Sequence, residues 1–185
     1  SPITIYDGKP DGSLRNAGYE YITRPTLAKA LPQYLNIMMT DILKSNPAPE
    51  CSERTSVHVH INARDMSIPS LLNVLLLYIV VERLLYRYVK KVSGVDRADN
   101  IFCVPLNKAD QLENLGETLH HMRKYREVDD VYRMRETFNL FVNAWQKYLG
   151  INFLRATDRK CGTVEYRHFA GTTDPEVITV WVALL

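Results

Sequence analysis

The sequence predicts an α+β domain, in which an antiparallel sheet carries helices packed on one face. Two segments, 55–63 and 162–169, alternate apolar and polar residues as half-buried strands do. Long stretches with helical periodicity separate them, without the regular strand–helix alternation of a parallel sheet. The face of the sheet without helices would be left to hold a site.

Size and composition are those of a single domain. The chain has 185 residues, 46% of them hydrophobic, and 23 basic residues balance 21 acidic ones. A formal net charge of +2 favours neither nucleic acid nor a membrane as a partner. The three cysteines lack the spacing of a zinc site or a disulfide framework, so a reduced cytoplasmic compartment is expected.

Short strands and a helix are expected in the first quarter of the chain. The strands lie at Ile3–Tyr6 and Ala17–Thr23, with turn residues between them. Thr26 is a fair N-cap for a helix that runs to about Lys44. Pro32 predicts either a kink in this helix or a late start.

Three further helical stretches follow from the apolar periodicity. One runs from about Pro69 to Val92 with Ser67 as its cap, and its first half is apolar nearly all round, which predicts a buried helix. The stretch 108–149 is mostly helical with a break near 126–130. Asp174 caps the last helix.

Side chains able to do chemistry gather on single faces of the strands. They are Glu20, then His58, His60 and Asn62, and finally Glu165 and Arg167. If the three strands pair in one sheet, carboxylates and imidazoles meet an arginine on one face. Carboxylates with imidazoles suit a divalent metal ion, and the arginine suits phosphate oxygens. Each motif also has an ordinary explanation, because histidines on a strand can be exposed and Glu-x-Arg often pairs across a sheet surface.

Several motifs resemble those of the amidoligase family. They are GYEYITRP, SVHVHIN, Arg97…Asn100…Cys103, Tyr148…Asn152 and GTVEYRHFAGTTDPEVITVWV. The last is the most specific, and the resemblance covers nearly the whole chain. Members occur in bacteriophages and mobile bacterial gene clusters, and the family resembles glutamine synthetase. The resemblance therefore implies a glutamine-synthetase-like catalytic domain in which ATP phosphorylates a carboxylate and an amine attacks the acyl phosphate.

The resemblance also implies roles for individual residues. Glu20, His58 and Glu165 would bind magnesium or manganese, and Arg167 would contact the transferred phosphate. Further family-motif positions, here taken as cofactor-binding, are His60, Asn62, Arg97 and Asn152, with Asp11 as a weaker candidate. The substrates would be a small-molecule or peptide carboxylate and an amine, in the cytoplasm of a bacterial or phage-infected cell.

The sequence departs from the family in its acidic motif. The family opens with a Gly-x-Glu-x-Glu strand whose glutamates bind the catalytic metals, and this motif does not occur here. We expect a domain at 1–185 that lacks its first strand and is incomplete at both ends, or a strand supplied by another chain. The 185-residue chain alone is then expected to be inactive or very weak. Two alternatives stay open: a non-catalytic interaction protein that retains the fold, and a metal-dependent hydrolase that uses His58, His60 and Glu165.

Overall fold

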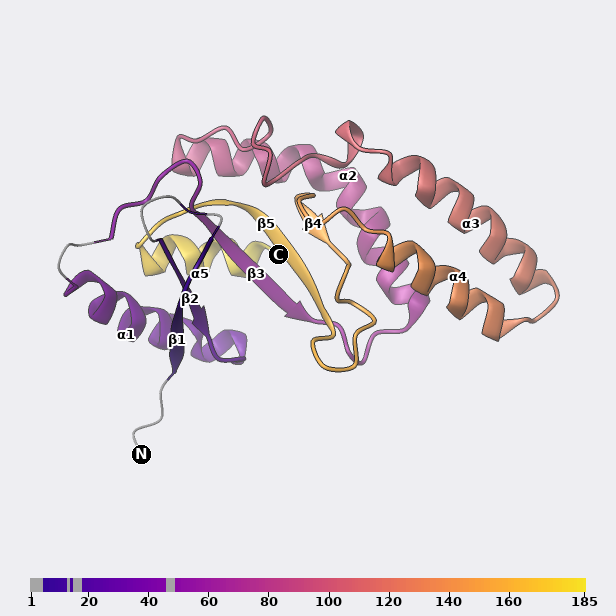
Figure 1. The fold of residues 1–185 in the computed structure, drawn as a ribbon, viewed down its shortest axis with the longest axis horizontal. Coiled ribbons are helices and arrows are strands. Elements are labelled where there is room, and N and C mark those ends of the chain that lie inside the picture. Colours follow the sequence, from indigo (N-terminus) through magenta and orange to yellow (C-terminus); the bar gives the residue numbers. More distant parts are fainter. Residues whose placement is uncertain (1–4, 13, 15–17, 46–48) are drawn as a thin grey trace. The chain divides into compact units, whose positions relative to one another are not determined.

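A computed structural model describes residues 5–12, 14, 18–45 and 49–185 of the chain (Figure 1). Contacts divide the chain into two compact units, residues 1–57 with 169–185 and residues 58–168. The described residues form five α-helices and two small antiparallel sheets. The predicted α+β class is therefore confirmed.

A β-hairpin in the first unit contains Glu20. Strands β1 (Tyr6–Pro10) and β2 (Tyr19–Thr23) pair antiparallel, with Lys9 opposite Glu20. The Lys9 ammonium and the Glu20 carboxylate form an ion pair at 3.1 Å. The strand expected at Ile3–Tyr6 overlaps β1 only at Tyr6, because Ile5 is not in a strand and residues 3 and 4 lie outside the described part of the chain. Residues 7–10, expected as a turn, belong to β1 instead.

The hairpin is a sheet of its own, separate from the three-stranded sheet formed by the strands of His58 and Glu165. The prediction that Glu20 shares a sheet with those two residues is wrong. The reason is local: β2 pairs with the strand just before it in sequence, which requires only a short turn and little loop-closure entropy. Period-two alternation shows which residues share a face of a strand, but it does not choose the neighbouring strand.

Helices α1 (Leu31–Leu43) and α5 (Pro175–Leu184) build the apolar core of the first unit. The core residues are Leu35, Met38, Met39, Ile42 and Ile178. A short 3-10 turn precedes α1, and Pro32 lies in its first turn, so the late start is confirmed. Because α1 begins only at Leu31, Thr26 is too far away to cap it, and that prediction is wrong.

The N-terminal cap of α5 is formed as the sequence predicts. The carboxylate of Asp174 accepts hydrogen bonds from the backbone N–H groups of Glu176 at 2.9 Å and Val177 at 3.2 Å. These N–H groups have no partner within the helix, and Pro175 at its first position has no N–H to satisfy. The cap therefore fixes where the helix begins.

The second sheet has the order β3-β5-β4, with β3 at Ser56–Asn62, β4 at Ile151–Asn152 and β5 at Thr163–Ala170. The N–H of Ala63 donates to the carbonyl of Gly162 at 2.7 Å, next to the ends of β3 and β5. Strands β3 and β5 are confirmed. Strand β4 was not expected, because two residues are too few to show alternation.

The long helix α2 (Ile68–Ser93) has the predicted ends. The side chain of Ser67 accepts from the N–H of Ser70 at 3.2 Å, and Gly94 closes the helix in the left-handed conformation with φ 72°. Only glycine adopts that conformation without strain, which is why the helix stops there. The buried stripe of α2 comprises Leu71, Leu75, Tyr78, Glu82, Leu85, Tyr86 and Val89.

The prediction that α2 is buried holds for one side only. Leu77, Val80 and Leu84 are 64%, 77% and 60% exposed. An apolar pattern around the whole helix does not show which stripe packs. By length and composition α2 could cross a membrane, but this is weak evidence, because the core helix of a soluble protein passes the same test.

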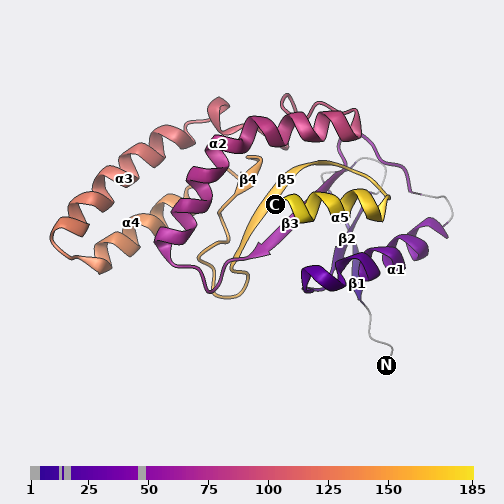
Figure 2. The same ribbon diagram turned by 180° about the vertical axis from the view of Figure 1, so that it is seen from behind.

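Helices α3 (Gln111–Glu127) and α4 (Val131–Asn143) form a helical hairpin, and Figures 1 and 2 show them side by side. The turn between them contains Asp129, with φ 53°, and Asp130, which accepts from the N–H of Arg133 at 3.0 Å. The break predicted near 126–130 is confirmed.

A buried polar cluster surrounds His168, a residue of β5. The Tyr78 hydroxyl donates to Glu82 Oε1 at 2.9 Å and lies 2.8 Å from His168 Nε2. Glu82 Oε1 also accepts from the N–H of Leu106 at 2.8 Å. His168 is fully buried, as expected for a structural histidine on the face opposite Glu165. Burial, with a smaller contribution from Arg97, lowers its pKa to about 3.

We expect His168 to make the protein less stable as the pH falls. Its pKa is about 3 in the folded protein against 6.5 as the ordinary value, so between these values the unfolded chain binds more protons. The free energy of unfolding should therefore fall by up to about 1.4 kcal/mol per pH unit in this window. Urea titrations at about pH 7, 6 and 5 should show a steeper loss for the wild type than for His168→Gln. His120→Gln, at an exposed histidine, is the control. Equal changes of unfolding free energy with pH in the wild type and His168→Gln would contradict the expectation.

Candidate functional site

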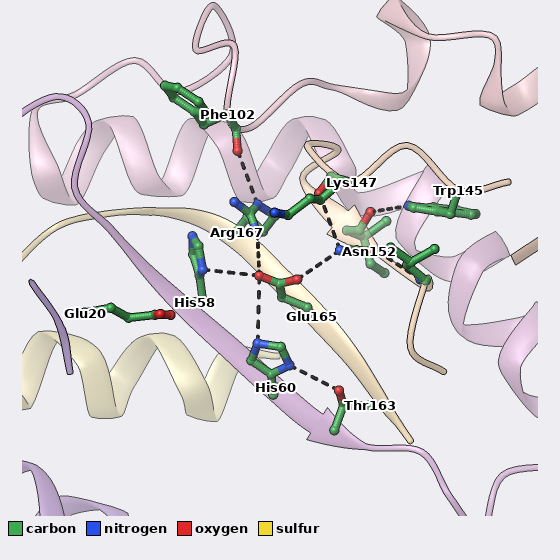
Figure 3. A network of polar contacts seen from close by, with 12 residues as sticks. Glu20, His58, His60, Phe102, Trp145, Lys147, Asn152, Thr163, Glu165 and Arg167 are labelled. Atoms are coloured by element: carbon green, nitrogen blue, oxygen red, sulfur yellow. Dashed lines mark hydrogen bonds and ion pairs between the residues drawn. The ribbon is translucent and has the colours of Figure 1, made fainter. Parts of the chain in front are cut away.

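Five of the predicted site residues come together at the β3-β5-β4 sheet, within the second unit (Figure 3): His58, His60, Asn152, Glu165 and Arg167. Glu165 is at their centre. Its Oε1 accepts from Arg167 Nη1 at 2.5 Å and lies 3.2 Å from His58 Nδ1 and 3.8 Å from His60 Nε2. Alternation along β3 and β5 brings these side chains to the same face. Of the predicted meeting of two carboxylates, imidazoles and an arginine, the part formed by Glu165, the two histidines and Arg167 is found. Glu20 belongs to the first unit.

The second oxygen of Glu165 is held from β4. Asn152 lies opposite Glu165 in the strand register, and its Nδ2 donates to Glu165 Oε2 at 3.0 Å. The same amide also donates to the backbone carbonyl of Lys147 at 3.4 Å. Both carboxylate oxygens therefore have donors, and Glu165, Asn152 and Arg167 are all buried. Hydrogen-bond partners and an opposite charge offset the cost of burying a carboxylate.

Arg167 is fixed by contacts at several of its atoms. Its Nε donates to the carbonyl of Phe102 at 3.3 Å, and its guanidinium carbon lies 5.7 Å from the centre of the Tyr148 ring. Its backbone N–H donates to the carbonyl of Gly150 at 2.8 Å. The planar fork is thereby held in one orientation, which suits an anion with several oxygens.

The two imidazoles lie at the more open side of the cluster. His58 is partly exposed and His60 is exposed. His60 Nδ1 lies 3.1 Å from the hydroxyl of Thr163, so that its Nε2 is turned toward Glu165. A ligand entering from solvent would meet the histidines as well as Glu165 and Arg167.

One comparison with known proteins identifies the family. A family model described as "Putative amidoligase enzyme" matches residues 20–185, which is most of the chain. The chain belongs to the amidoligase family. The resemblance inferred from the motifs is thus confirmed, and the matched range includes the whole cluster around Glu165. No curated protein and no solved structure matched this amidoligase.

Three other predicted residues of the amidoligase have structural partners of their own. Asn62 Oδ1 accepts from the N–H of Arg64 at 3.3 Å, at the end of β3. Arg97 is 1% exposed and donates to the carbonyl of Arg167 at 3.5 Å, and burial lowers its pKa. Asp11 lies in the hairpin of the first unit, where its N–H donates to the carbonyl of Gly18 at 2.9 Å. Their predicted contacts with a cofactor stay predictions.

Metal binding by the amidoligase also stays a prediction. Among the described residues, no group of three His, Cys, Asp or Glu side chains is arranged to hold a metal ion. His58 and Glu165 are chemically suitable ligands, but Arg167 already donates to Glu165 Oε1. The second unit adds only Glu165 as a carboxylate at this cluster, whereas magnesium prefers several oxygen ligands. Glu20, the other predicted ligand, belongs to the first unit.

Sequence reasoning missed several residues around this cluster. Thr163 is the partner of His60, Phe102 and Tyr148 contact Arg167, and Lys147 lies over the Tyr148 ring. Tyr148 lay within a family motif, but its neighbours come from loops distant in sequence. No local sequence pattern predicts such contacts.

Proposed function

We propose that this amidoligase forms amide bonds by phosphorylating a carboxylate with ATP. A carboxylate oxygen attacks the γ-phosphorus, the bond to ADP breaks, and an acyl phosphate results. The nitrogen of an amine then attacks the acyl carbon, phosphate leaves with the carboxylate oxygen, and the amine loses a proton. The proposal includes a glutamine-synthetase-like fold, small-molecule or peptide substrates and a cytoplasmic location.

The observation that carries this proposal is the buried Glu165–Arg167 pair with its open histidine side. Transfer of a phosphoryl group needs little covalent chemistry from the protein, and mainly needs fixed positive charge at the phosphoryl oxygens. In this proposal Arg167 supplies it, and contacts from Glu165, Phe102 and Tyr148 support the role because they hold its guanidinium before any ligand arrives. Preorganisation of this kind is what makes an electrostatic contact effective.

The neighbours of Arg167 take supporting roles in the proposal. Asn152 donates to the second oxygen of the Glu165 carboxylate, and His58 and His60 would line the side by which substrate enters. When magnesium or manganese is bound with ATP, His58 and Glu165 would be ligands from this cluster and the ion would neutralise phosphate charge. No side chain is required to act as a covalent nucleophile.

The identity of the nucleotide product tests the proposal. The full-length protein is incubated with magnesium, ATP and a panel of carboxylates with amines, and the products are separated by chromatography. We expect ADP, phosphate and the amide to form in equal amounts. Glu165→Gln weakens the hold on Arg167, so we expect the rate of product formation to fall by at least about a hundredfold.

Two other results would contradict this mechanism. AMP with pyrophosphate would mean that the carboxylate is adenylated. Hydrolysis of an amide or ester without consumption of ATP would favour the metal-dependent hydrolase.

A further inference from the structure

Lys147 places a second cation at the Tyr148 ring that Arg167 also contacts, and the mechanism above leaves it without a role. Its Nζ lies 5.5 Å from the centre of the Tyr148 ring, and the Arg167 guanidinium carbon lies 5.7 Å from the same centre. Figure 3 shows the Lys147 side chain extending toward the Arg167 guanidinium. Lys147 is exposed, and it forms no ion pair with any residue that the structure describes.

Tyr148 is a fixed support for both cations. Its carbonyl accepts from the N–H of Val104 at 2.7 Å, and Gly150 donates back to the carbonyl of Val104 at 2.9 Å. The ring of Phe102 meets the ring of Tyr148 edge-on, with centres 5.5 Å apart. Although Tyr148 is 41% exposed, its backbone and ring are thereby held. A cation over an aromatic ring is attracted by the electron density of its face.

The charges around this ring favour an anion. Lys147 and Arg167 repel each other, and Arg97 adds a buried guanidinium that donates to the carbonyl of Arg167. Glu165 faces Arg167 and offsets one of these charges. An anion that contacts both Lys147 and Arg167 would relieve their repulsion, and this positive field would draw it in.

We infer that Lys147 and Arg167, positioned by Tyr148, form one anion-binding pair. This pair binds neighbouring phosphates of a nucleotide's polyphosphate chain. The inference rests on the proposed function and adds Lys147 and Tyr148 to its site. Arginine's fork matches two oxygens of one phosphate, and the lysine ammonium acts as a point charge on the next. A polyphosphate chain carries several charges along its length, so it can engage both cations, whereas one carboxylate group carries a single charge.

Binding of tripolyphosphate and ATP to the full-length protein, measured by calorimetry, tests the inference. We expect Lys147→Met and Tyr148→Leu to bind both ligands about ten- to a hundredfold more weakly, as for loss of a charged hydrogen bond. Tyr148→Phe keeps the aromatic face and should bind like the wild type. Lys124→Met, at an exposed lysine of α3, is the matched control, and thermal unfolding checks that each variant is folded.

The outcomes separate the inference from the proposed function. If the wild type binds ATP and Lys147→Met binds it equally well, the inference is overturned and the proposed function stands. If Lys147→Met loses affinity for the dicarboxylate malonate but not for tripolyphosphate, the pair belongs to the carboxylate substrate and the inference is again overturned. A wild type that binds neither ATP nor tripolyphosphate contradicts both.

Discussion

Replacing Arg167 by methionine should lower amide formation by about a hundred- to a thousandfold, the usual cost of one preorganised electrostatic contact. The guanidinium is the fixed positive group of the cluster, and its donors to Glu165 and Phe102 already set its plane. Methionine keeps much of the apolar volume but removes the charge and all donors. Turnover is measured as ADP release at saturating ATP and carboxylate.

A second substitution separates the loss of chemistry from a loss of folding. Arg167→Met leaves Glu165, whose side chain is 11% exposed, without its charged partner, and breaking a buried pair costs about 3–5 kcal/mol of stability. Arg167→Lys retains the charge without the two-pronged geometry, so we expect a folded protein with a smaller but clear loss. The exposed Arg159, replaced by methionine, is the control. Turnover like the wild type in a folded Arg167→Met would contradict the assigned role.

Replacing Gly150 by alanine should strongly destabilise the protein next to the site. A Cβ at this position would lie 2.6 Å from the Tyr86 hydroxyl, 2.7 Å from His168 Nε2 and 2.8 Å from the Tyr78 hydroxyl. The glycine backbone cannot easily move away, because its carbonyl accepts from Arg167 and its N–H donates to Val104. We expect a loss of about 1–3 kcal/mol or more, as for an overpacked core.

Urea denaturation of the full-length protein measures this loss. Gly116→Ala is a matched control, because Gly116 lies within α3 and a Cβ there meets nothing within 4 Å. That substitution should stabilise by up to about 1 kcal/mol, since alanine is the better helix former. Equal denaturation midpoints for Gly150→Ala and the wild type would show that the cluster around Tyr78 yields more readily than its contacts indicate.

Local rules located most elements of this fold. Alternation found β3 and β5, and Ser67, Gly94 and Asp174 marked helix ends through hydrogen bonds that involve only neighbouring residues. The meeting of His58, Glu165 and Arg167 also followed, because strand periodicity fixes which side chains share a face. These are consequences of backbone geometry within one or two elements.

The failures are of a different kind, because they depend on which segments meet. Strand β2, which contains Glu20, pairs with β1 in a separate sheet. Asn152 was a candidate from a family motif, but its bond to Glu165 could not be predicted, because it comes from a two-residue strand without a pattern. Lys147 was missed because it lies over the Tyr148 ring from a loop. The exposed side of α2 could not be predicted for the same reason, since the apolar pattern does not show which side of the helix other segments pack against.

Transfer of an oxygen isotope from substrate to phosphate is the direct measurement of carboxylate activation at this cluster. The full-length protein is given ATP, magnesium, an amine and a carboxylate labelled with oxygen-18, and the released phosphate is analysed by mass spectrometry. If an acyl phosphate forms, each amide made leaves one labelled oxygen in phosphate. Arg167→Met should lower the rate at which labelled phosphate appears by at least about a hundredfold. Labelled AMP, or phosphate whose new oxygen comes from water while amide forms, would contradict the mechanism.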